Sequence, residues 1–120
     1  MEDLTKSEER IMQIFWDIKS GFVKDIIDRL TDVPKPPYST ISSVVRILER
    51  KGYLGFNAYG KTYEYYPLIS KTEYRKQSFK KLLNNYFDGS KQSLLSYMVS
   101  EEELSKEDIA SIKAIIENQK

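Results

Sequence analysis

Four polar side chains repeat along residues 39–50 at a spacing that suits contact with a nucleic acid. At about 100° per residue, one line of a helix over this segment holds Ser39, Ser43, Arg46 and Arg50. Short hydroxyl side chains near a helix start can approach phosphates and base edges closely, while an arginine can span to a guanine or hold a phosphate. Arg46 is therefore the best single candidate for a contact to a base.

Other polar residues extend this candidate surface. Thr40 and Ser42 flank the line, and Lys61 lies at a predicted hairpin turn, from which it can reach a backbone phosphate. Tyr59 beside it can donate a hydrogen bond or stack. The predicted DNA-binding residues are Ser39, Thr40, Ser42, Ser43, Arg46, Arg50 and Lys61. The pattern alone is equally compatible with the solvated face of an ordinary amphipathic helix.

The overall charge is close to neutral, at a formal +1, so the chain lacks the strongly basic composition of many nucleic-acid binders. The placement of the charges is more informative. Residues 1–37 carry six basic and eight acidic side chains, whereas residues 38–61 carry four basic side chains and one acidic one. The surplus consists of Arg46, Arg50, Lys51 and Lys61 against Glu49. The case for DNA binding therefore depends on where these few cations lie.

The composition excludes several kinds of chemistry. The 120 residues include no cysteine and no histidine, which removes disulfides, thiolate metal sites and the commonest general base. The carboxylates of Glu101, Glu102 and Glu103 point in different directions on a helix and are better explained as a solvated helix start than as a metal site. No glycine-rich elbow, phosphate loop or acid-base pair accompanies any serine. We expect no catalytic residues, no metal, no cofactor and no small-molecule substrate.

The hydrophobic pattern argues against a membrane protein. Apolar runs are far shorter than the roughly 20 residues needed to cross a bilayer, and the N-terminal segment is polar and acidic. We therefore expect no export signal, no stable association with a membrane and a cytoplasmic location. The length suits one compact domain, or a small reading domain with an attached oligomerisation segment.

Three short helices are predicted ahead of the hairpin. The first begins at a capping box, in which Thr5 and Glu8 satisfy each other's backbone N–H groups, and ends before Gly21. Prolines within residues 34–37 force the second helix to end, and Gly52 ends the third as a left-handed cap. The apolar residues spaced for one buried face on each helix are Ile11, Ile14, Phe15 and Ile18; Val23, Ile26, Ile27 and Leu30; and Ile41, Val44, Val45 and Leu48.

Over residues 53–67 the hydrophobic period changes to two, which predicts a β-hairpin with its turn at residues 57–60. Tyr63 and Tyr65 are interpreted as packing within this hairpin, and Trp16 as a core residue. Three helices followed by a hairpin are the order of a winged helix, in which the third helix and the hairpin face the ligand. The predicted fold class is mainly α, an α+β winged helix with a three-helix core and a β-hairpin wing, followed by a C-terminal helical segment.

Three further helices are predicted after Pro67, with a break at residues 88–90 and a second capping pattern at residues 105–108. Their apolar faces are too thin to form a core in one chain, and leaving them in water forfeits roughly 1.5–3 kcal/mol for each large side chain. Pairing with a second copy is the simplest solution, because two-fold dimers are the commonest oligomers. The predicted dimerisation residues are Phe79, Leu82, Leu83, Tyr86, Leu94, Leu95, Met98, Ile109, Ile112 and Ile116. The predicted domains are residues 1–69, for DNA binding, and residues 70–120, for dimerisation.

Several stretches together carry a resemblance to a known family. They are Leu4-Thr5-Lys6-Ser7-Glu8 with Ile14-Phe15-Trp16, Ser39-Thr40-Ile41 through Lys51-Gly52-Tyr53-Leu54, Gly60 through Pro67, Phe87 through Ser90, and Leu104-Ser105. Over essentially its whole length the chain resembles the BlaI/MecI family of penicillinase repressors. The resemblance implies a bacterial winged-helix transcriptional regulator, a repressor that binds palindromic double-stranded operator DNA as a homodimer.

The resemblance also implies a route of induction. Such repressors are typically encoded beside a membrane sensor with a metalloprotease domain, and cleavage in the best-known members corresponds to residues 93–99 here. Where those members have an Asn-Phe pair, this chain has Tyr97 and Met98, the possible regulatory cleavage region. The cysteines of the copper-responsive branch are absent. Ser42 and Phe56 stand where the family often has basic residues, so fewer phosphate contacts are expected.

A second hypothesis is a winged-helix module that contacts other proteins without binding an operator. The near-neutral charge and the apolar residues Phe56 and Tyr59 on the predicted wing favour it. Footprinting of a two-fold symmetric DNA site would distinguish the two hypotheses.

Overall fold

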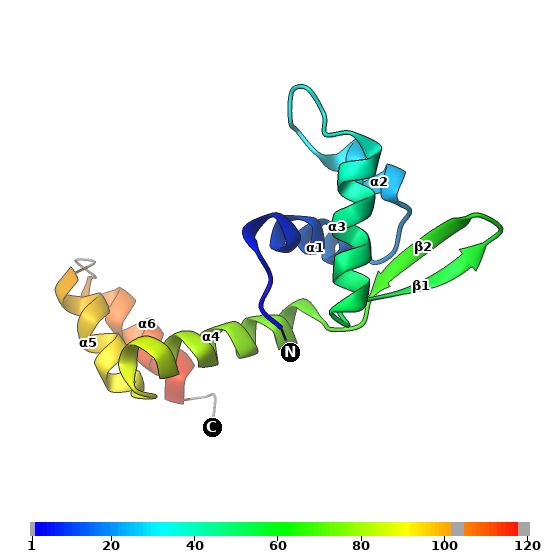
Figure 1. Ribbon diagram of the computed structural model, residues 1–120. Helices are drawn as coiled ribbons and strands as arrows, with labels where there is room; N and C mark the ends of the chain where they lie inside the picture. The colour runs from blue at the N-terminus through cyan, green and yellow to red at the C-terminus, as the bar shows by residue number, and fades with distance from the viewer. Residues whose placement is uncertain (1, 102–104, 118–120) are drawn as a thin grey trace. The chain divides into compact units, whose positions relative to one another are not determined.

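The computed structural model of the chain describes residues 2–101 and 105–117. Its elements are α1 (Lys6–Ile18), α2 (Val23–Arg29), α3 (Tyr38–Arg50), β1 (Leu54–Tyr59), β2 (Thr62–Pro67), α4 (Lys71–Phe87), α5 (Lys91–Glu101) and α6 (Lys106–Glu117), shown in Figure 1. The chain divides into two compact units, Met1–Tyr74 and Arg75–Lys120. Within the described ranges, none of the helices is long and apolar enough to span a membrane.

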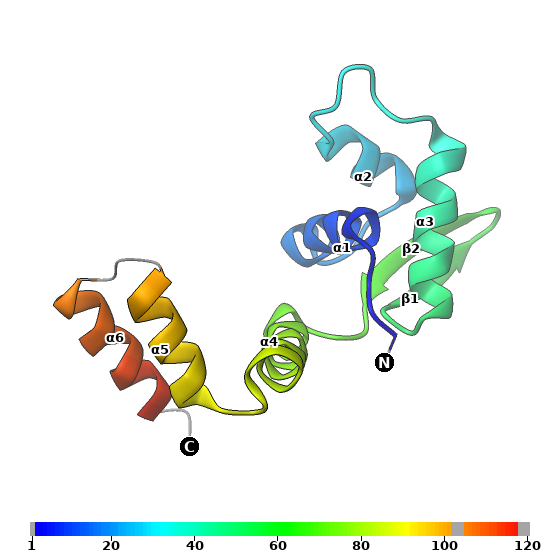
Figure 2. The same cartoon turned by 60° about the vertical axis from the view of Figure 1, so that its left-hand side comes forward.

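The core of the first unit is formed by one face of each of α1, α2 and α3, together with the base of the hairpin (Figure 2). The predicted helical spacing is confirmed: residues at the predicted positions are buried, or lie partly buried against the core. Trp16, predicted as a core residue, is half-buried there and donates from Nε1 to the Ile69 carbonyl at 2.9 Å. The buried core residues are Ile11, Met12, Phe15, Val23, Ile26, Leu30, Ile41, Val45, Leu48, Tyr53, Leu54, Tyr65 and Ile69.

Both predicted ends of α1 are confirmed. The Thr5 hydroxyl accepts from the Glu8 amide at 3.2 Å, and the Glu8 carboxylate accepts from the Thr5 amide at 3.0 Å. Beyond the helix, the backbone of Gly21 packs closely against the side chain of Ile18. A Cβ added at residue 21 would lie 2.6 Å from Cδ1 of Ile18. The Gly21 backbone forms an isolated bridge to Tyr65, with N···O distances of 2.9 and 2.8 Å. The connection between α1 and α2 therefore lies against β2.

The hairpin turn lies further along the chain than predicted. The strands pair antiparallel with Tyr59 opposite Thr62, which leaves Gly60 and Lys61 as a two-residue turn. The predicted turn at residues 57–60 is wrong because residues 57–59 belong to β1. A tight hairpin turn requires positive φ, which Gly60 supplies at 64°. Lys61 lies in the turn, as predicted.

The third helix ends as predicted. Gly52 has a φ of 87°, the left-handed conformation expected of a C-terminal cap. The next amide, that of Tyr53, donates to the Leu48 carbonyl at 3.0 Å. After this hydrogen-bonded turn, the chain passes directly from α3 into β1.

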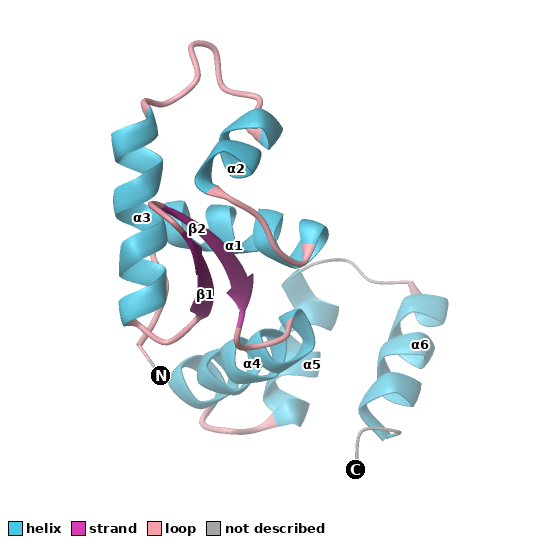
Figure 3. Ribbon diagram, turned by 90° about the vertical axis from the view of Figure 1, so that its right-hand side faces the viewer, coloured by secondary structure: helices cyan, strands magenta, loops and turns pink. Residues whose placement is uncertain are grey.

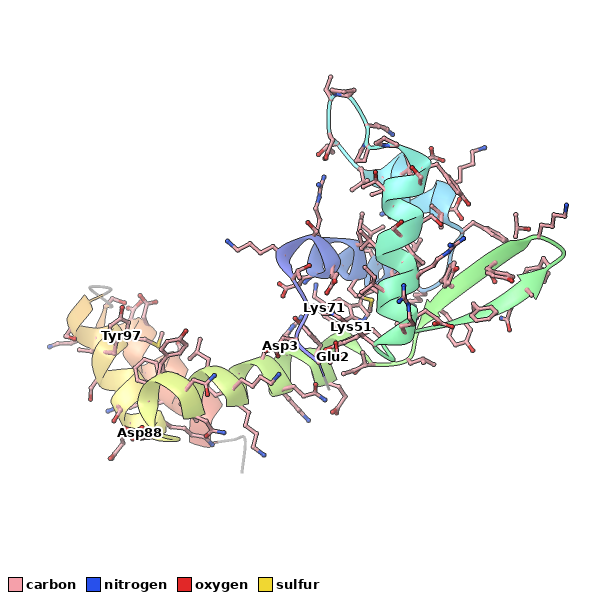
Figure 4. The ribbon with its side chains drawn as sticks, in the orientation of Figure 1. Glu2, Asp3, Lys51, Lys71, Asp88 and Tyr97 are labelled. Atoms are coloured by element: carbon pink, nitrogen blue, oxygen red, sulfur yellow. The ribbon has the colours of Figure 1, made fainter. Side chains whose placement is uncertain are left out.

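A partly buried ion pair, not predicted from sequence, joins the start of α1 to the end of α3. Lys51 Nζ lies 2.6 Å from Oε1 of Glu8, whose side chain is nearly inaccessible to solvent. The same ammonium donates to the Asp3 carbonyl at 3.0 Å, and the Tyr53 hydroxyl donates to the Glu2 carbonyl at 2.6 Å. Figure 4 shows Glu2, Asp3 and Lys51 gathered at this place. These bonds fix the N-terminal segment against the turn that follows α3.

The ion pair holds both groups in their charged forms. Burial acts to raise the pKa of Glu8, but the hydrogen bonds from Lys51 and from the Thr5 backbone outweigh it, so the pKa lies below its ordinary value of 4.5. The hydrogen bond to Glu8 raises the pKa of Lys51. Since Glu8 is also half of the capping box, its carboxylate both caps the start of α1 and binds Lys51 at the end of α3.

The first turn of α4 belongs to the first unit. The Tyr74 hydroxyl donates to a carboxylate oxygen of Glu9 at 2.8 Å, and its ring centroid lies 5.3 Å from that of Trp16 and 6.0 Å from that of Tyr53. The division between the units therefore follows Tyr74, whereas the sequence places it after Ile69.

The second unit contains the rest of α4 together with α5 and α6. Asp88 and Gly89 both have positive φ, at 49° and 78°, which confirms the predicted break. The predicted cap at the start of α6 is confirmed by a 3.0 Å bond from the Asp108 amide to the Ser105 hydroxyl. The acidic run does not begin a helix at Glu101, which is the last residue of α5; Glu102 and Glu103 lie outside the described residues.

The depressed pKa of Glu8 predicts an acid-sensitive fold. Because its folded-state pKa lies below 4.5, its contribution to stability is present above the unfolded-state pKa and is lost as the pH falls through the folded-state value. Glu8→Gln should therefore lower the free energy of unfolding at neutral pH and flatten its decline below pH 4.5. Urea denaturation over a series of pH values measures both effects. An equally steep acid decline in the variant would contradict this role of Glu8.

Candidate nucleic-acid interface

The outward line of α3, defined as Ser39, Ser43, Arg46 and Arg50, is exposed along its whole length. The opposite side of the helix carries Ile41, Val45 and Leu48, all buried in the core. This burial fixes the rotation of the helix about its own axis. Of the two flanking residues, Thr40 is exposed and Ser42 is half-buried. The predicted line is therefore available to a ligand.

Only some of the polar groups on this line form hydrogen bonds within the protein. The Ser43 hydroxyl donates to the Ser39 carbonyl one turn earlier, at 2.9 Å. Among the described residues, Arg46 and Arg50 take part in no ion pair. The N-cap of α3 is Pro37, which offers no side-chain cap to the first amide groups of the helix. Hydrogen-bond donors thus remain available at both ends of the line.

Lys51 does not belong to this surface, although it contributes to the positive surplus counted from the sequence. Its ammonium is bound to Glu8, and its side chain is only 16% exposed. The cations that α3 and the hairpin present outward are instead Arg46, Arg50 and Lys61. The charge available for a polyanion is smaller than the sequence count indicates.

The hairpin, or wing, borders the same surface as α3. β1 begins and β2 ends near the C-terminal end of α3 (Figure 3), and the hairpin extends from there to the turn at Gly60 and Lys61 (Figure 1). A depression of about 270 Å³ lies between the two elements. Its lining from α3 is Arg46, Glu49 and Arg50, and its lining from the wing is Phe56, Tyr63 and Tyr65. Helix and wing therefore line this depression together, with two arginines and Glu49 from the helix and aromatic rings from the wing.

The two tyrosines interpreted as hairpin packing differ in their surroundings. Tyr65 is 6% exposed and packs edge-on against Phe15 with a centroid distance of 6.4 Å, so it is part of the core. Burial raises the pKa of its hydroxyl, and the positive charge of Arg46 partly opposes that rise. Tyr63 is 44% exposed and stacks on Phe56 at 4.7 Å. Tyr63 therefore packs within the wing and still presents its ring to solvent.

The sequence reasoning missed a second hollow at the other end of α3. A depression of about 440 Å³ lies where α2 begins, α3 begins and β2 starts, and its lining includes Phe22, Lys24, Tyr38 and Tyr63. Tyr63 lines both depressions. The strand alternation could have indicated it, because Tyr63 shares a strand face with the core residue Tyr65 and lies one pair further from the core.

The predicted dimerisation residues occupy varied environments. Phe79, Leu82 and Tyr86 on α4 are exposed, whereas Leu83 is already buried within its own chain. Leu94, Leu95 and Met98 on α5 are half-buried. The side chains of Ile109, Ile112 and Ile116 lie outside the described residues. In the possible cleavage region, Tyr97 is exposed and its ring lies 5.7 Å from that of Phe87.

Nothing in the described part of the chain resembles a metal centre: no group of three or more acidic side chains there could hold an ion.

The three-helix core, the exposed line on α3 and the adjoining hairpin define a winged-helix domain. The solution structure of the DNA binding domain of the repressor BlaI is similar to this chain, with a TM-score of 0.52 and 23% identity, covering 62% of this chain and 94% of that one. A profile described as penicillinase repressor matches residues 4–118. The chain therefore belongs to the penicillinase-repressor family, whose members are transcriptional repressors and not enzymes.

Individual relatives resemble the chain along nearly all of its length. The methicillin resistance regulatory protein MecI of Staphylococcus aureus (strain N315) is 24% identical over 114 residues, covering 95% of this chain and 93% of that protein. The penicillinase repressor of Bacillus licheniformis is 24% identical over 117 residues, covering 98% and 91%. The resemblance inferred from the sequence motifs is confirmed.

Replacing the outward arginines should leave the fold intact. Arg46→Ala and Arg50→Ala are expected to change the free energy of unfolding by less than about 0.5 kcal/mol, because both side chains are exposed. Leu48→Ala, on the buried side of the same helix, should cost about 2–5 kcal/mol. Urea denaturation followed by circular dichroism measures all three variants. A large loss in either arginine variant would mean that its side chain supports the core.

Proposed function

We propose that this protein is a transcriptional repressor that binds a palindromic operator on double-stranded DNA as a homodimer. The observation that carries the proposal is the exposed outward line of α3, held opposite a buried apolar line of the same helix. Under this proposal the unit Met1–Tyr74 binds DNA and the unit Arg75–Lys120 forms the dimer. Membership of a family of repressors supports the same assignment.

The proposed contacts follow from the chemistry of the outward line. An α-helix fits the major groove, where an arginine can donate two hydrogen bonds to O6 and N7 of guanine. Arg46 is the proposed base contact, with Ser39, Thr40, Ser42 and Ser43 close to base edges or phosphates. Arg50 and, on the wing, Lys61 are proposed to contact phosphates. Phosphate contacts position the protein, and base contacts select the sequence.

The loss of one proposed base contact should weaken operator binding strongly. Arg46→Ala is expected to cost roughly 1–3 kcal/mol on the operator, because a bidentate contact to guanine is lost. The operator can be obtained by selecting genomic fragments that the protein retains, followed by footprinting. Affinities measured by fluorescence anisotropy at several salt concentrations should also fall steeply as salt rises.

Arg29→Ala supplies a matched control. Arg29 is an exposed arginine on α2 that lines neither of the two depressions beside α3 and the wing. Its removal should leave operator affinity unchanged. Equal effects of the two arginine variants, or binding that ignores salt, would count against the proposal. Retention of a protein partner without any footprint would favour the protein-contact module instead.

The dimer is proposed from apolar surface on the second unit. Phe79, Leu82 and Tyr86 lie on one side of α4 and are 45%, 42% and 77% exposed. Exposed apolar patches of this kind usually mark an interaction site, and a two-fold copy of the same helix is the simplest partner. A dimer would also present two copies of α3, as a palindromic site requires.

A charge introduced into this apolar side should dissociate the dimer. Leu82→Glu is expected to raise the dimer dissociation constant by at least tenfold, since a buried unpaired carboxylate costs more than about 1.4 kcal/mol. Gln77→Glu adds the same charge on the opposite side of α4, where residue 77 is exposed, and should leave the dimer intact. Sedimentation equilibrium measures both variants. A parent chain that is monomeric at micromolar concentration would contradict the dimer.

Induction through a membrane sensor protease is part of the same proposal. The region assigned to cleavage, Tyr97 and Met98, lies within α5, and Tyr97 is exposed. A cut there would separate α6 and the end of α5 from α4 while leaving the unit Met1–Tyr74 whole. Each released DNA-binding unit would then bind half of the operator, without the gain that two linked units provide.

A further inference from the structure

Phe22 lies where hydrogen bonds fix the backbone on both sides of it. Just before it, Gly21 forms the isolated bridge to Tyr65 of β2, with N···O distances of 2.9 and 2.8 Å. Just after it, the Asp25 carboxylate accepts from the Phe22 amide at 2.8 Å. The Phe22 carbonyl accepts from the Asp25 and Ile26 amides at 2.9 and 3.3 Å. The direction in which the Phe22 side chain leaves the backbone is therefore fixed by its neighbours.

A phenylalanine is an unusual residue for this position. Phe22 is the N-cap of α2, where Ser, Thr, Asp and Asn are preferred because their side chains accept a hydrogen bond from the first helical amides. The Phe22 side chain makes no such bond. Its ring instead lies near the ring of Tyr59 on β1, with 6.3 Å between the centroids and 57° between the planes. The side chain of this N-cap therefore contacts the wing and does not cap its own helix.

The contact reaches the outer half of the wing, which we define as residues 57–64. Tyr59, the last residue of β1, is 57% exposed. Among the described residues, no hydrogen bond or ion pair joins the outer half of the wing to a helix. The stack of Tyr63 on Phe56 joins two residues of the same hairpin. The ring of Phe22 is thus a contact that ties the outer half of the wing to the helical part of the domain.

The point of contact lies beside the proposed phosphate contact of the wing. Tyr59 pairs with Thr62, and these two residues enclose the turn of Gly60 and Lys61. The Thr62 hydroxyl also donates to the Tyr59 carbonyl at 2.8 Å, which closes the turn. Because Lys61 follows Tyr59 by two residues within this closed turn, a displacement of Tyr59 would also move Lys61.

We propose that Phe22 is a positioning residue for DNA binding, whose ring holds Tyr59 and thereby places Lys61 where it can reach a phosphate. This inference rests on the proposed function, which assigns Lys61 to a phosphate. In this role Phe22 acts through Lys61 and not on the DNA itself. Without the ring, the outer half of the wing would sample more conformations. Ordering it on DNA would then cost more conformational entropy, and the contact of Lys61 would weaken.

The first measurement needs no DNA. Hydrogen–deuterium exchange on the full chain reports how often the outer half of the wing opens. Phe22→Ala should speed exchange in residues 57–64 roughly two- to tenfold, as expected for the loss of one aromatic pair, while amides of α1 and α3 keep their parental rates. Phe22→Tyr keeps the ring and should exchange like the parent. Thermal unfolding checks each variant, and Phe22→Leu replaces Phe22→Ala if that variant does not fold.

Ile27→Ala is the matched control for these exchange rates. Ile27 is, like Phe22, a half-buried apolar residue, and it packs from α2 against the core. Its truncation should lower stability without speeding exchange selectively in residues 57–64. The control thus separates a contact with the wing from a general loosening of α2.

A double-mutant cycle on a duplex of arbitrary sequence tests the link to Lys61. Lys61→Ala should make the slope of log affinity against log salt shallower by about 0.9 for each bound copy, the value of one phosphate contact. Phe22→Ala should shift the slope in the same direction and weaken binding roughly threefold. In the Lys61→Ala background, Phe22→Ala should change neither affinity nor slope. A residue that supported only the fold would weaken binding equally in both backgrounds.

The outcomes separate this inference from the proposed function. Parental exchange in residues 57–64 of a folded Phe22→Ala, or the same increase in Ile27→Ala, would overturn the positioning role. So would an equal loss of affinity in both backgrounds, or a parental salt slope in Lys61→Ala. Operator recognition would still stand in these cases if Arg46→Ala lost affinity on the selected operator. Failure of the parent chain to bind any duplex at low salt would overturn both.

Discussion

Burial of the apolar side of α3 is the constraint on which the rest of the structure depends. Ile41, Val45 and Leu48 are held in a core shared with α1, α2 and the base of the hairpin. A helix so held cannot rotate about its axis without exposing these side chains. The hydroxyls and guanidinium groups on its opposite side are therefore fixed outward by packing, and none of them needs a partner within the chain to stay there. The position of the polar surface is a consequence of the hydrophobic effect.

Much of the architecture could be predicted from sequence because it depends on local patterns. Hydrophobic spacing located the three helices of the first unit, and the pairing of Thr5 with Glu8 located the start of α1. Gly52 marked the end of α3 through its left-handed backbone, a property that few other residues share. The outward line of α3 followed from the same periodicity as its buried line. These features require only neighbours within a turn or two of helix.

Features that depend on distant parts of the chain were missed. Lys51 was counted as a free cation because nothing near it in sequence indicates its bond to Glu8. The hairpin turn was placed too early because Asn57 suits a turn by residue type, whereas the pairing of β1 with β2 decides the matter. The exposure of Tyr63 depends on how far the wing extends past the core. In each case the deciding contact joins segments whose relative placement exists only after folding.

The bridge between Gly21 and Tyr65 has a consequence for the mechanics of the wing. An isolated pair of strands is at best marginally stable in water, and here the connection between α1 and α2 gives β2 a short backbone neighbour on its second side. The stiffness and the angle of the hairpin are thereby tied to Gly21, which precedes its bridge partner Tyr65 by 44 residues. A side chain introduced at Gly21 is therefore expected to change the angle of the hairpin while leaving the packing of α3 in place.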